Sequence, residues 1–422
     1  MSLPEHGQPK DQILEALEAK RANDVRWQDG RTFGMVYDGG PELHAVQDAV
    51  ASAFLHENAL NTMAFPSLGQ IQGEVVRAAA DLCHGGDAAA GFMTSGGTES
   101  ILMAVLAARE RGRIERGIDR PEMVVGENAH AAFHKAAHSF GITLHKVPVR
   151  DDWRVDTDAM ADCVTDSTVL VVGSAPAYPQ GVIDDIETIA AIGADAGANV
   201  HTDACMGGFI LPFAEQLGHD VPPWDFRVPG VTSISADIHK LGYAPKGASV
   251  ILHRSKELRR YQTFVFDQWL GGFYASPNMQ GTRSGLPMAL AWATMWHLGL
   301  DGYQHLTDVA LRAAAQMRAG VRAIDGIDVL GDPQFHLLAI AADPAPPAGA
   351  AGVDIFAVGD AMAARGWFHD RQAPPDSLHA TVSAGNAPVM NAYLVDLADV
   401  VAEAQATAAA VDDRSTNYAT LE

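Results

Sequence analysis

Cysteine is scarce in this chain, with only three residues, Cys83, Cys163 and Cys205, among 422. They are widely spaced and form no Cys-x-x-Cys pair, so neither a disulfide framework nor a structural zinc site is indicated. No His-Glu-x-x-His or comparable ligand spacing occurs, which argues against a metal hydrolase. Unpaired cysteines fit a reducing compartment, and we expect a cytoplasmic protein without a bound metal.

Positive charge is also in short supply. The chain has 29 lysines and arginines against 52 aspartates and glutamates, a formal net charge of −23. This balance argues against a nucleic-acid partner and against an anionic membrane surface. An anionic substrate would therefore have to be bound by a local cluster of cations. No signal peptide and no apolar run long enough to span a bilayer is evident, so no membrane span is expected.

The residues that are present predict an α/β protein. An apolar content of 48% is ordinary for globular proteins, and the length suggests two or three domains. Strands and helices alternate through the first two thirds of the chain, which favours a mostly parallel sheet covered by helices on both faces. Strands are predicted at 91–93, 123–126, 169–175, 199–204, 231–236 and 248–254, and helices at 41–56, 70–83, 128–140 and 184–197.

The pattern changes after residue 285. Helices are predicted at 286–298, 303–324, 353–365 and 388–411, and strands at 335–342 and 378–384. We therefore expect an N-terminal arm and helix over 1–60, a large α/β domain over 61–290 and a small α+β domain over 291–422.

The stretch 233–247 carries two lysines in an unusual setting. A short strand leads directly into Asp237, His239 and Lys240, and a turn containing glycine and proline then carries Lys246 before the next strand. Lysines are usually surface residues, so a lysine between two strands needs a reason. One such reason is a reactive amine that forms a Schiff base with a carbonyl.

Two further features end strands upstream. The sequence 94–98, Thr-Ser-Gly-Gly-Thr, opens a helix, where glycine amides and the helix dipole can hold an anion; a simple helix cap with flexible glycines is the alternative. Asp203 ends another strand. Pyridoxal phosphate needs a lysine for its aldehyde, a carboxylate for its ring nitrogen and amides for its phosphate. Lys240, Asp203 and the amides of Gly96, Gly97 and Thr98 supply these parts, and ligands of such sheets gather at the carboxyl ends of strands.

Taken together, these motifs resemble the group II decarboxylase family of pyridoxal-phosphate enzymes, which has the fold-type I architecture, and within it the sphingosine-1-phosphate lyase branch. The resemblance is strong over about residues 30–290 and looser beyond. It is carried by the segments 94–100, 129–137, 173–176, 181–187, 201–209, 233–247 and 271–285.

The resemblance implies roles at the cofactor. Lys240 would form the Schiff base, Asp203 would pair with the ring nitrogen, and His239 would reach the phosphate beside Gly96, Gly97 and Thr98. His130 would stack on the ring, unless it is a helix-surface histidine. His201 would orient Asp203 or be a hydrogen-bonded core histidine, and Cys205 is better explained as a buried small side chain.

The resemblance also implies a substrate site and a second subunit. Tyr37, Lys246 and Tyr178, with Arg283, would surround a phosphate or the reacting hydroxyl, although Tyr37 taken alone is better explained by packing. Segment 271–285 lies near the dimer interface in this family. A homodimer is therefore expected, in which Gly281 and Thr282 serve the cofactor of the neighbouring subunit.

Two segments depart from the lyase pattern. Residues 58–66 read Asn-Ala-Leu-Asn-Thr-Met-Ala-Phe-Pro and lack the histidine, aspartate and internal prolines usual there. Residues 178–181 read Tyr-Pro-Gln-Gly in place of a Phe-Pro-His-Gly-like stretch. Both changes would alter the substrate entrance, so the identity of the substrate stays open.

The expected function is cleavage of a carbon–carbon bond in a phosphorylated β-hydroxy amine, such as a sphingoid-base 1-phosphate. An aldehyde and phosphoethanolamine would result, and Lys240, Lys246 or Tyr178 would handle the protons. The alternative is decarboxylation of an amino acid, which would need a cation for the substrate carboxylate; Lys246 belongs to the lyase pattern and favours the first reading. A non-catalytic pyridoxal-phosphate fold is disfavoured because Lys240, Asp203 and His130 are all present.

Overall fold

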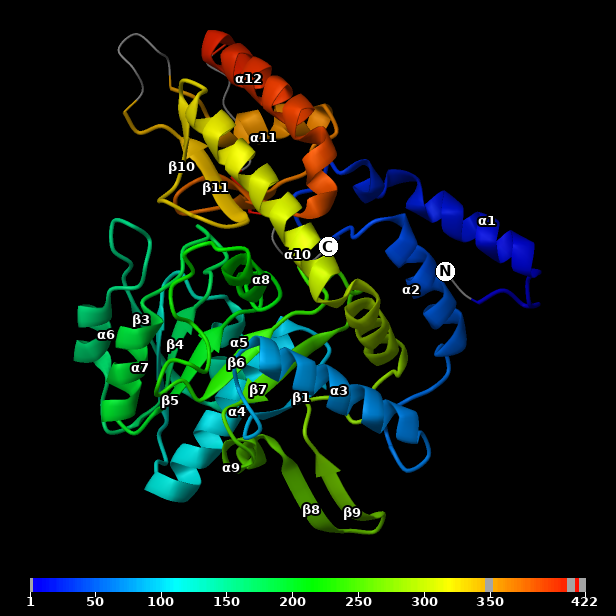
Figure 1. Cartoon of the computed structure of the whole chain (residues 1–422), viewed down its shortest axis with the longest axis vertical. Coiled ribbons are helices and arrows are strands. Elements are labelled where there is room, and N and C mark those ends of the chain that lie inside the picture. The colour runs from blue at the N-terminus through cyan, green and yellow to red at the C-terminus, as the bar shows by residue number, and fades with distance from the viewer. Residues whose placement is uncertain (1–2, 346–351, 408–413, 417–422) are drawn as a thin grey trace.

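A seven-stranded sheet organises the first two thirds of the chain. The computed structural model describes residues 3–345, 352–407 and 414–416 (Figure 1). The strands lie in the order β1 (Ala90–Thr94), β7 (Ser249–His253), β6 (Ser233–Ala236), β5 (Asn199–Asp203), β4 (Thr168–Ser174), β2 (Glu122–Gly126) and β3 (Thr143–Val147). Only β7 runs antiparallel to its two neighbours, β1 and β6. The other four pairings, β6–β5, β5–β4, β4–β2 and β2–β3, are parallel. The expected mostly parallel sheet is confirmed.

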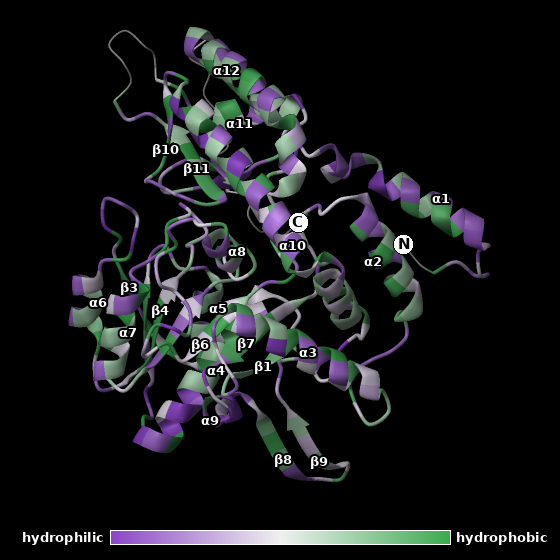
Figure 2. Ribbon diagram, viewed as in Figure 1, coloured by the Kyte–Doolittle hydropathy of each residue, from purple (hydrophilic) through white to green (hydrophobic). Residues whose placement is uncertain are grey.

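Helices cover both faces of this sheet, because its central strands are apolar on both sides. All seven residues of β4 are buried. On one face lie α4 (Gly97–Arg116) and α5 (Ala132–Phe140). The other face is covered by α3 (Pro66–Leu82), α6 (Thr157–Cys163), α7 (Ile186–Asp195), α8 (Leu211–Gln216) and the first half of α10 (Leu286–Arg322). Figure 2 shows the hydrophobic strands enclosed by helices whose outer surfaces are hydrophilic.

Helix α10 links the two cores of the molecule (Figure 1). Met288 and Ala291 pack in the core of the large domain, whereas Met317 and Val321 pack in a second core. The two helices predicted at 286–298 and 303–324 are joined in one element that is broken at Gly299, whose φ of 58° and ψ of −173° are not helical. A φ in this range favours glycine, so the break occurs where the sequence tolerates it.

The second core belongs to a C-terminal antiparallel sheet in the order β10 (Ile327–Val329), β11 (Leu337–Ala342), β13 (Ser377–Thr381) and β12 (Asp370–Gln372). Helix α11 (Ile355–Ala364) packs against β11 and β13, and α12 (Met390–Thr407) packs against α11 and α10 in the same core. Phe33, from the N-terminal segment, is buried in this core too. The predicted helix 388–411 is confirmed as far as residue 407, and residues 408–411 lie outside the described residues.

The N-terminal region contains α1 (Lys10–Lys20) and α2 (Pro41–Ala53). The sequence did not predict the hairpin of β8 (Phe264–Trp269) and β9 (Gly272–Ser276), which follows the short helix α9 (Lys256–Arg259) and projects from the sheet domain (Figure 1). The helix predicted from residue 128 begins only at Ala132, so the expectation that His130 belongs to a helix was wrong. Among the described residues, no helix combines the length and the apolar character needed to cross a membrane.

Candidate active site

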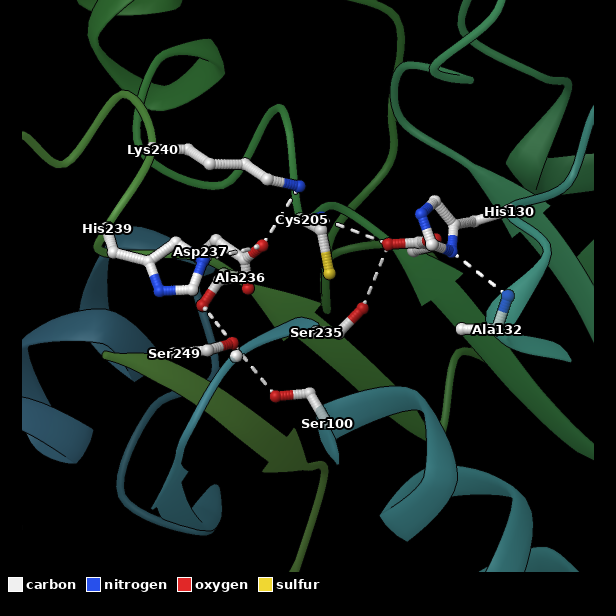
Figure 3. A network of polar contacts seen from close by, with 12 residues as sticks. Ser100, His130, Ala132, Cys205, Ser235, Ala236, Asp237, His239, Lys240 and Ser249 are labelled. Carbon is white, nitrogen blue, oxygen red and sulfur yellow. Dashed lines mark hydrogen bonds and ion pairs between the residues drawn. The ribbon is translucent and has the colours of Figure 1, made fainter. Parts of the chain in front are cut away.

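The predicted functional residues meet at one edge of the large sheet. Thr94 ends β1, Asp203 ends β5, and Asp237 to Lys240 follow β6. Because β7 is antiparallel, its first residue Ser249 lies at the same edge, opposite Thr94. The Ser249 hydroxyl donates to the carbonyl of Ala236 at 3.1 Å and lies 2.9 Å from the Ser100 hydroxyl of α4 (Figure 3). These bonds fix the beginning of α4 to the strand that leads to the lysine.

Lys240 is paired with a carboxylate that the sequence analysis did not assign. Its Nζ lies 2.9 Å from Oδ2 of Asp237, and only 1% of the Asp237 side chain is exposed (Figure 3). Burial alone would raise the pKa of Asp237, but the positive charge of Lys240 and contacts with His239 hold that pKa well below its ordinary value. Asp237 is therefore a carboxylate at neutral pH, facing the amine of Lys240.

Asp203 is fixed from two sides. Its Oδ1 accepts the backbone N–H of Cys205 and the hydroxyl of Ser235, each at 3.1 Å. The same hydroxyl is 3.1 Å from Nε2 of His201, whose Nδ1 is 2.9 Å from the Ser233 hydroxyl. Burial lowers the pKa of His201 to about 4, so its ring is neutral. Both readings of His201 agree with this geometry, because it is a hydrogen-bonded core histidine that reaches Asp203 through Ser235.

The beginning of α4 forms a cradle that only backbone can line. A Cβ on Gly97 would lie 2.7 Å from Sγ of Cys205 and 2.8 Å from Oδ2 of Asp237, and one on Gly96 would lie 3.1 Å from the His239 ring. The first N–H groups of a helix have no partner within the helix and attract anions. His239 accepts the N–H groups of Gly247 and Ala248 on Nδ1, each at 3.2 Å. Because Nδ1 is an acceptor in both bonds, the ring carries a hydrogen on Nε2.

This cradle, Asp203 and Lys240 together match what pyridoxal phosphate requires: donors for a phosphate, a carboxylate for a protonated ring nitrogen and an amine for an aldehyde. The residues present therefore fit the cofactor.

His130 lies in the loop between β2 and α5 (Figure 3). Its ring could stack there on the ring of the cofactor. Its Nδ1 accepts the N–H of Ala132 at 3.0 Å. Burial is the largest influence and lowers the pKa of His130, while the nearby charge of Asp203 opposes this. The ring is therefore neutral, with its hydrogen on Nε2.

Lys246 places a second amine beside Lys240, and this amine packs against Tyr37. The Nζ of Lys246 donates to the His239 carbonyl at 3.2 Å and lies 4.9 Å from the centre of the Tyr37 ring. Burial of the amine and then the charge of Lys240 lower the pKa of Lys246 to about 8, although the residue as a whole remains exposed. An amine at this place is a local cation of the kind that an anionic ligand would need in a chain with a net charge of −23.

Tyr178 follows β4 and lines, together with His130, a cavity of about 1020 Å³ between the large domain and the C-terminal sheet. A cavity of this size matches those that bind small ligands. Its walls include apolar side chains from both domains, among them Trp153, Leu330 and Ile355.

Three predicted residues stand apart from this cluster. Gly281 and Thr282 are exposed in the single chain. Arg283 donates to Oε1 of Gln72 at 2.8 Å and contacts the Met93 carbonyl at 3.4 Å.

Cys205 is buried, and burial raises the pKa of its thiol well above the ordinary value, which agrees with a packing role. Thr98, at the beginning of α4, is exposed.

Sequence reasoning missed Asp237 and Ser235 as partners of the predicted residues. Asp237 could have been found, because a residue three positions before Lys240 in a tight turn can meet its side chain. No sequence signal pointed to Asp370 and His379, which contact Tyr178 from the C-terminal sheet.

Comparison with known proteins agrees with this geometry. The pyridoxal-dependent decarboxylase conserved domain matches residues 1–340. Sphingosine-1-phosphate lyase of Oryza sativa subsp. japonica is 40% identical over 399 residues, which are 93% of this chain and 72% of that protein. A probable sphingosine-1-phosphate lyase of Legionella pneumophila is 35% identical and matches 83% of this chain and 58% of its own length.

Solved structures give the same result. A sphingosine-1-phosphate lyase of Burkholderia pseudomallei superposes with a TM-score of 0.91 at 40% identity, covering 97% of this chain and 94% of that one. Glutamate decarboxylase of Lactobacillus brevis, at 20% identity and a TM-score of 0.83, shares the fold. The chain therefore belongs to the group II family of pyridoxal-dependent decarboxylases, and its cofactor is pyridoxal 5'-phosphate.

Proposed function

We propose that this lyase cleaves the carbon–carbon bond of a phosphorylated β-hydroxy amine, such as a sphingoid-base 1-phosphate, to an aldehyde and phosphoethanolamine. The observation that carries the proposal is the position of Lys246, whose amine contacts His239 and the Tyr37 ring next to Lys240. A substrate phosphate needs such a cation in a chain with a net charge of −23. The lyases of Oryza and Burkholderia named above support the substrate class.

The chain holds its cofactor with the residues of the sheet edge. Lys240 would bind the aldehyde, Asp203 would keep the ring nitrogen protonated, and His130 would stack on the ring. Gly96, Gly97 and Thr98 would offer N–H groups to the phosphate, with His239 beside them. When bound, pyridoxal phosphate withdraws electrons from the substrate carbon that carries the amine. Because Oδ1 of Asp203 already accepts two hydrogen bonds, its orientation is set before the cofactor arrives.

The remaining residues act on the substrate. Lys246 and Tyr37 bind its phosphate, and Tyr178 faces its β-hydroxyl. That hydroxyl must lose its proton as the Cα–Cβ bond breaks and the aldehyde leaves. Tyr178, Lys246 and the released amine of Lys240 are the groups that can move protons at this place.

A second copy of the chain completes this proposal. The β8–β9 hairpin exposes 54% of Trp269, 110% of the reference area of Leu270 and 73% of Phe273. An exposed apolar cluster of this kind typically marks an interface. Gly281 and Thr282, which follow the hairpin, would then reach the cofactor of the partner subunit in a homodimer. With three unpaired cysteines among the described residues, we also propose a cytoplasmic location, which cell fractionation would test.

Absorbance spectroscopy and product analysis test the function together. The purified holoenzyme should show the visible-edge band of its lysine-bound cofactor, and a sphingosine-1-phosphate-like amine should shift that band and release an aldehyde. A panel of carboxyl-labelled amino acids forms the second arm. Release of labelled carbon dioxide at a useful rate, without aldehyde from the phosphorylated amine, would replace the proposal by decarboxylation.

A further inference from the structure

The C-terminal domain holds Tyr178 through a single pair of strands. Asp370 of β12 and His379 of β13 are directly opposite each other in that pair. The His379 ring stacks on Tyr178 with ring centres 3.9 Å apart and an interplanar angle of 24°. The Tyr178 hydroxyl donates to Oδ2 of Asp370 at 2.9 Å. One strand pair therefore fixes both the ring and the hydroxyl of a residue in the candidate active site.

The histidine in this pair is itself rigidly held. Nε2 of His379 lies 2.9 Å from the Thr381 hydroxyl, and its backbone carbonyl accepts a hydrogen bond from Nδ1 of His369 at 3.1 Å. His369 in turn stacks on Phe33 at 4.8 Å. Burial lowers the pKa of His379 to about 3, so the ring against Tyr178 is neutral. Tyr178 is thus bound to a wall that cannot easily shift.

Asp370 is unusual because its carboxyl is buried without a cation. It is 5% exposed, and within the described part of the chain its side chain enters no ion pair and its Oδ1 finds no hydrogen-bond partner. Burial raises the pKa of Asp370, while the hydrogen bond from Tyr178 opposes the rise. A buried carboxyl that accepts only one hydrogen bond lowers the free energy of unfolding. The position of Asp370 next to Tyr178 is therefore explained by function and not by stability.

The functional explanation comes from where Tyr178 and Asp370 lie. Tyr178 lines the same cavity as His130. The positive charge of Lys240 also contributes to the lowered pKa of His379 and of the neighbouring His336, so the wall lies within electrostatic range of the cofactor lysine. A tyrosine hydroxyl can donate or accept, and its hydrogen rotates to suit its partners.

We propose that Asp370 is a positioning residue for catalysis: by taking the hydrogen of Tyr178, it leaves the phenol oxygen as an acceptor directed at the substrate. This inference rests on the proposed function, in which the β-hydroxyl of the substrate must lose its proton. Because the phenol O–H donates to Asp370, it does not donate to the substrate. The substrate hydroxyl therefore donates its own hydrogen to the phenol oxygen of Tyr178. Tyr178 touches the substrate, and Asp370 acts only through Tyr178.

Four variants of the holoenzyme test this. Asp370→Ala should lower kcat by roughly 10- to 100-fold with KM within about twofold, because one hydroxyl is misdirected while the phosphate contacts remain. Asp370→Asn, which can still accept the hydrogen, should retain most of the activity. Tyr178→Phe should lower kcat by about as much as Asp370→Ala. The double variant, Asp370→Ala with Tyr178→Phe, should have a kcat no lower than either single variant. Asp360→Ala, at an exposed carboxylate paired with the neighbouring Arg371, is the matched control and should change little.

The inference would be overturned if the reductions in kcat of the two single variants multiply in the double variant, or if Asp370→Ala is fully active. A readout without substrate keeps it separate from the proposed function. Isotope-edited infrared spectra of labelled tyrosine, taken as a difference from Tyr178→Phe, should show a donating phenol in the wild type and in Asp370→Asn, and a changed C–O stretch in Asp370→Ala. A wild type that cleaves no phosphorylated amine would defeat the proposed function alone, whereas an unchanged stretch in Asp370→Ala would defeat the inference alone.

Discussion

At the scale of single residues, Lys246 sets the first expectation. Its pKa is lowered to about 8 by burial of the amine and the charge of Lys240, so the cation is fully present below that pH and is lost as the pH rises through it. Since the residue is partly exposed, we expect the loss between pH 8 and the ordinary lysine value. If Lys246 binds the substrate phosphate, kcat/KM, which reports the free enzyme, should fall over this range.

Two substitutions check this assignment. Lys246→Arg, whose charge persists to higher pH, should move the basic limb upward and keep measurable activity. Lys246→Met should lower kcat/KM by about 100-fold or more, because a charge-assisted phosphate contact is lost. A basic limb that stays in place in Lys246→Arg would assign it to another group.

The pair of Asp237 and Lys240 gives a prediction about stability. Removing one partner of a buried ion pair leaves the other charge uncompensated. In the cofactor-free protein at neutral pH, Asp237→Asn should therefore lower the free energy of unfolding by about 3 kcal/mol. Asp237→Asn combined with Lys240→Met should recover much of this loss, and denaturant unfolding of the wild type and the two variants measures the difference. A double variant as unstable as Asp237→Asn would show that the loss comes from the contact of the carboxylate with His239 and not from the uncompensated charge of Lys240.

At the scale of elements, the beginning of α4 can be tested through its glycines. A methyl group on Gly97 would lie 2.7 Å from Cys205 and 2.8 Å from Asp237, within the space proposed for the cofactor phosphate. Gly97→Ala should weaken cofactor binding by roughly 10- to 100-fold, in line with the cost of overpacking. Dialysis followed by absorbance titration with pyridoxal phosphate measures this affinity.

The matched control is Gly73→Ala in α3, where no atom lies within 4 Å of the added Cβ. Alanine is favoured over glycine in a helix, so this variant should bind the cofactor normally and be slightly more stable. Equal cofactor affinities in the two variants would mean that the phosphate lies elsewhere.

The elements of the large domain could be predicted from the sequence because their signals are local. Strand β4 is a continuous run of buried residues, and α7 is capped by Asp185, whose side chain accepts the N–H of Thr188. The C-terminal contacts could not be predicted in this way. Strand β12 has three residues, and only its pairing with β13 places Asp370 beside His379. The contact of this pair with Tyr178 depends on how two separate cores pack.

The same distinction applies to the candidate site. Lys240 and Asp203 follow strands of one sheet, so a predicted topology already placed them at one edge. The pairing of Lys240 with Asp237 depends on turn geometry, and the link from His201 to Asp203 passes through Ser235 of the adjacent strand. Alternation of side chains along a strand could have indicated Ser233 and Ser235 as a matched pair, but not their partner.

At the scale of the whole molecule, the exposed hairpin gives the last prediction. Its apolar residues Trp269, Leu270 and Phe273 would be covered by a second subunit, and each active site would need Gly281 and Thr282 of that subunit. Introducing charge through Leu270→Asp and Phe273→Asp together should convert a dimer to monomers and reduce activity strongly, while the internal network around Lys240 stays intact. Analytical ultracentrifugation and the aldehyde assay, performed on the same sample, measure both effects.

Val395→Asp, at a 62% exposed position of α12 in the C-terminal domain, adds one negative charge away from the hairpin and should leave mass and activity unchanged. Cofactor retention separates two explanations of an inactive hairpin variant. A monomer that still binds pyridoxal phosphate but does not turn over would lack a contribution from its partner at the substrate. A monomer that also loses the cofactor would place the partner residues at the cofactor itself, as expected for Thr282. A hairpin variant that remains an active dimer, or an active wild-type monomer, would remove the shared site from the proposal and leave the chemistry to one chain.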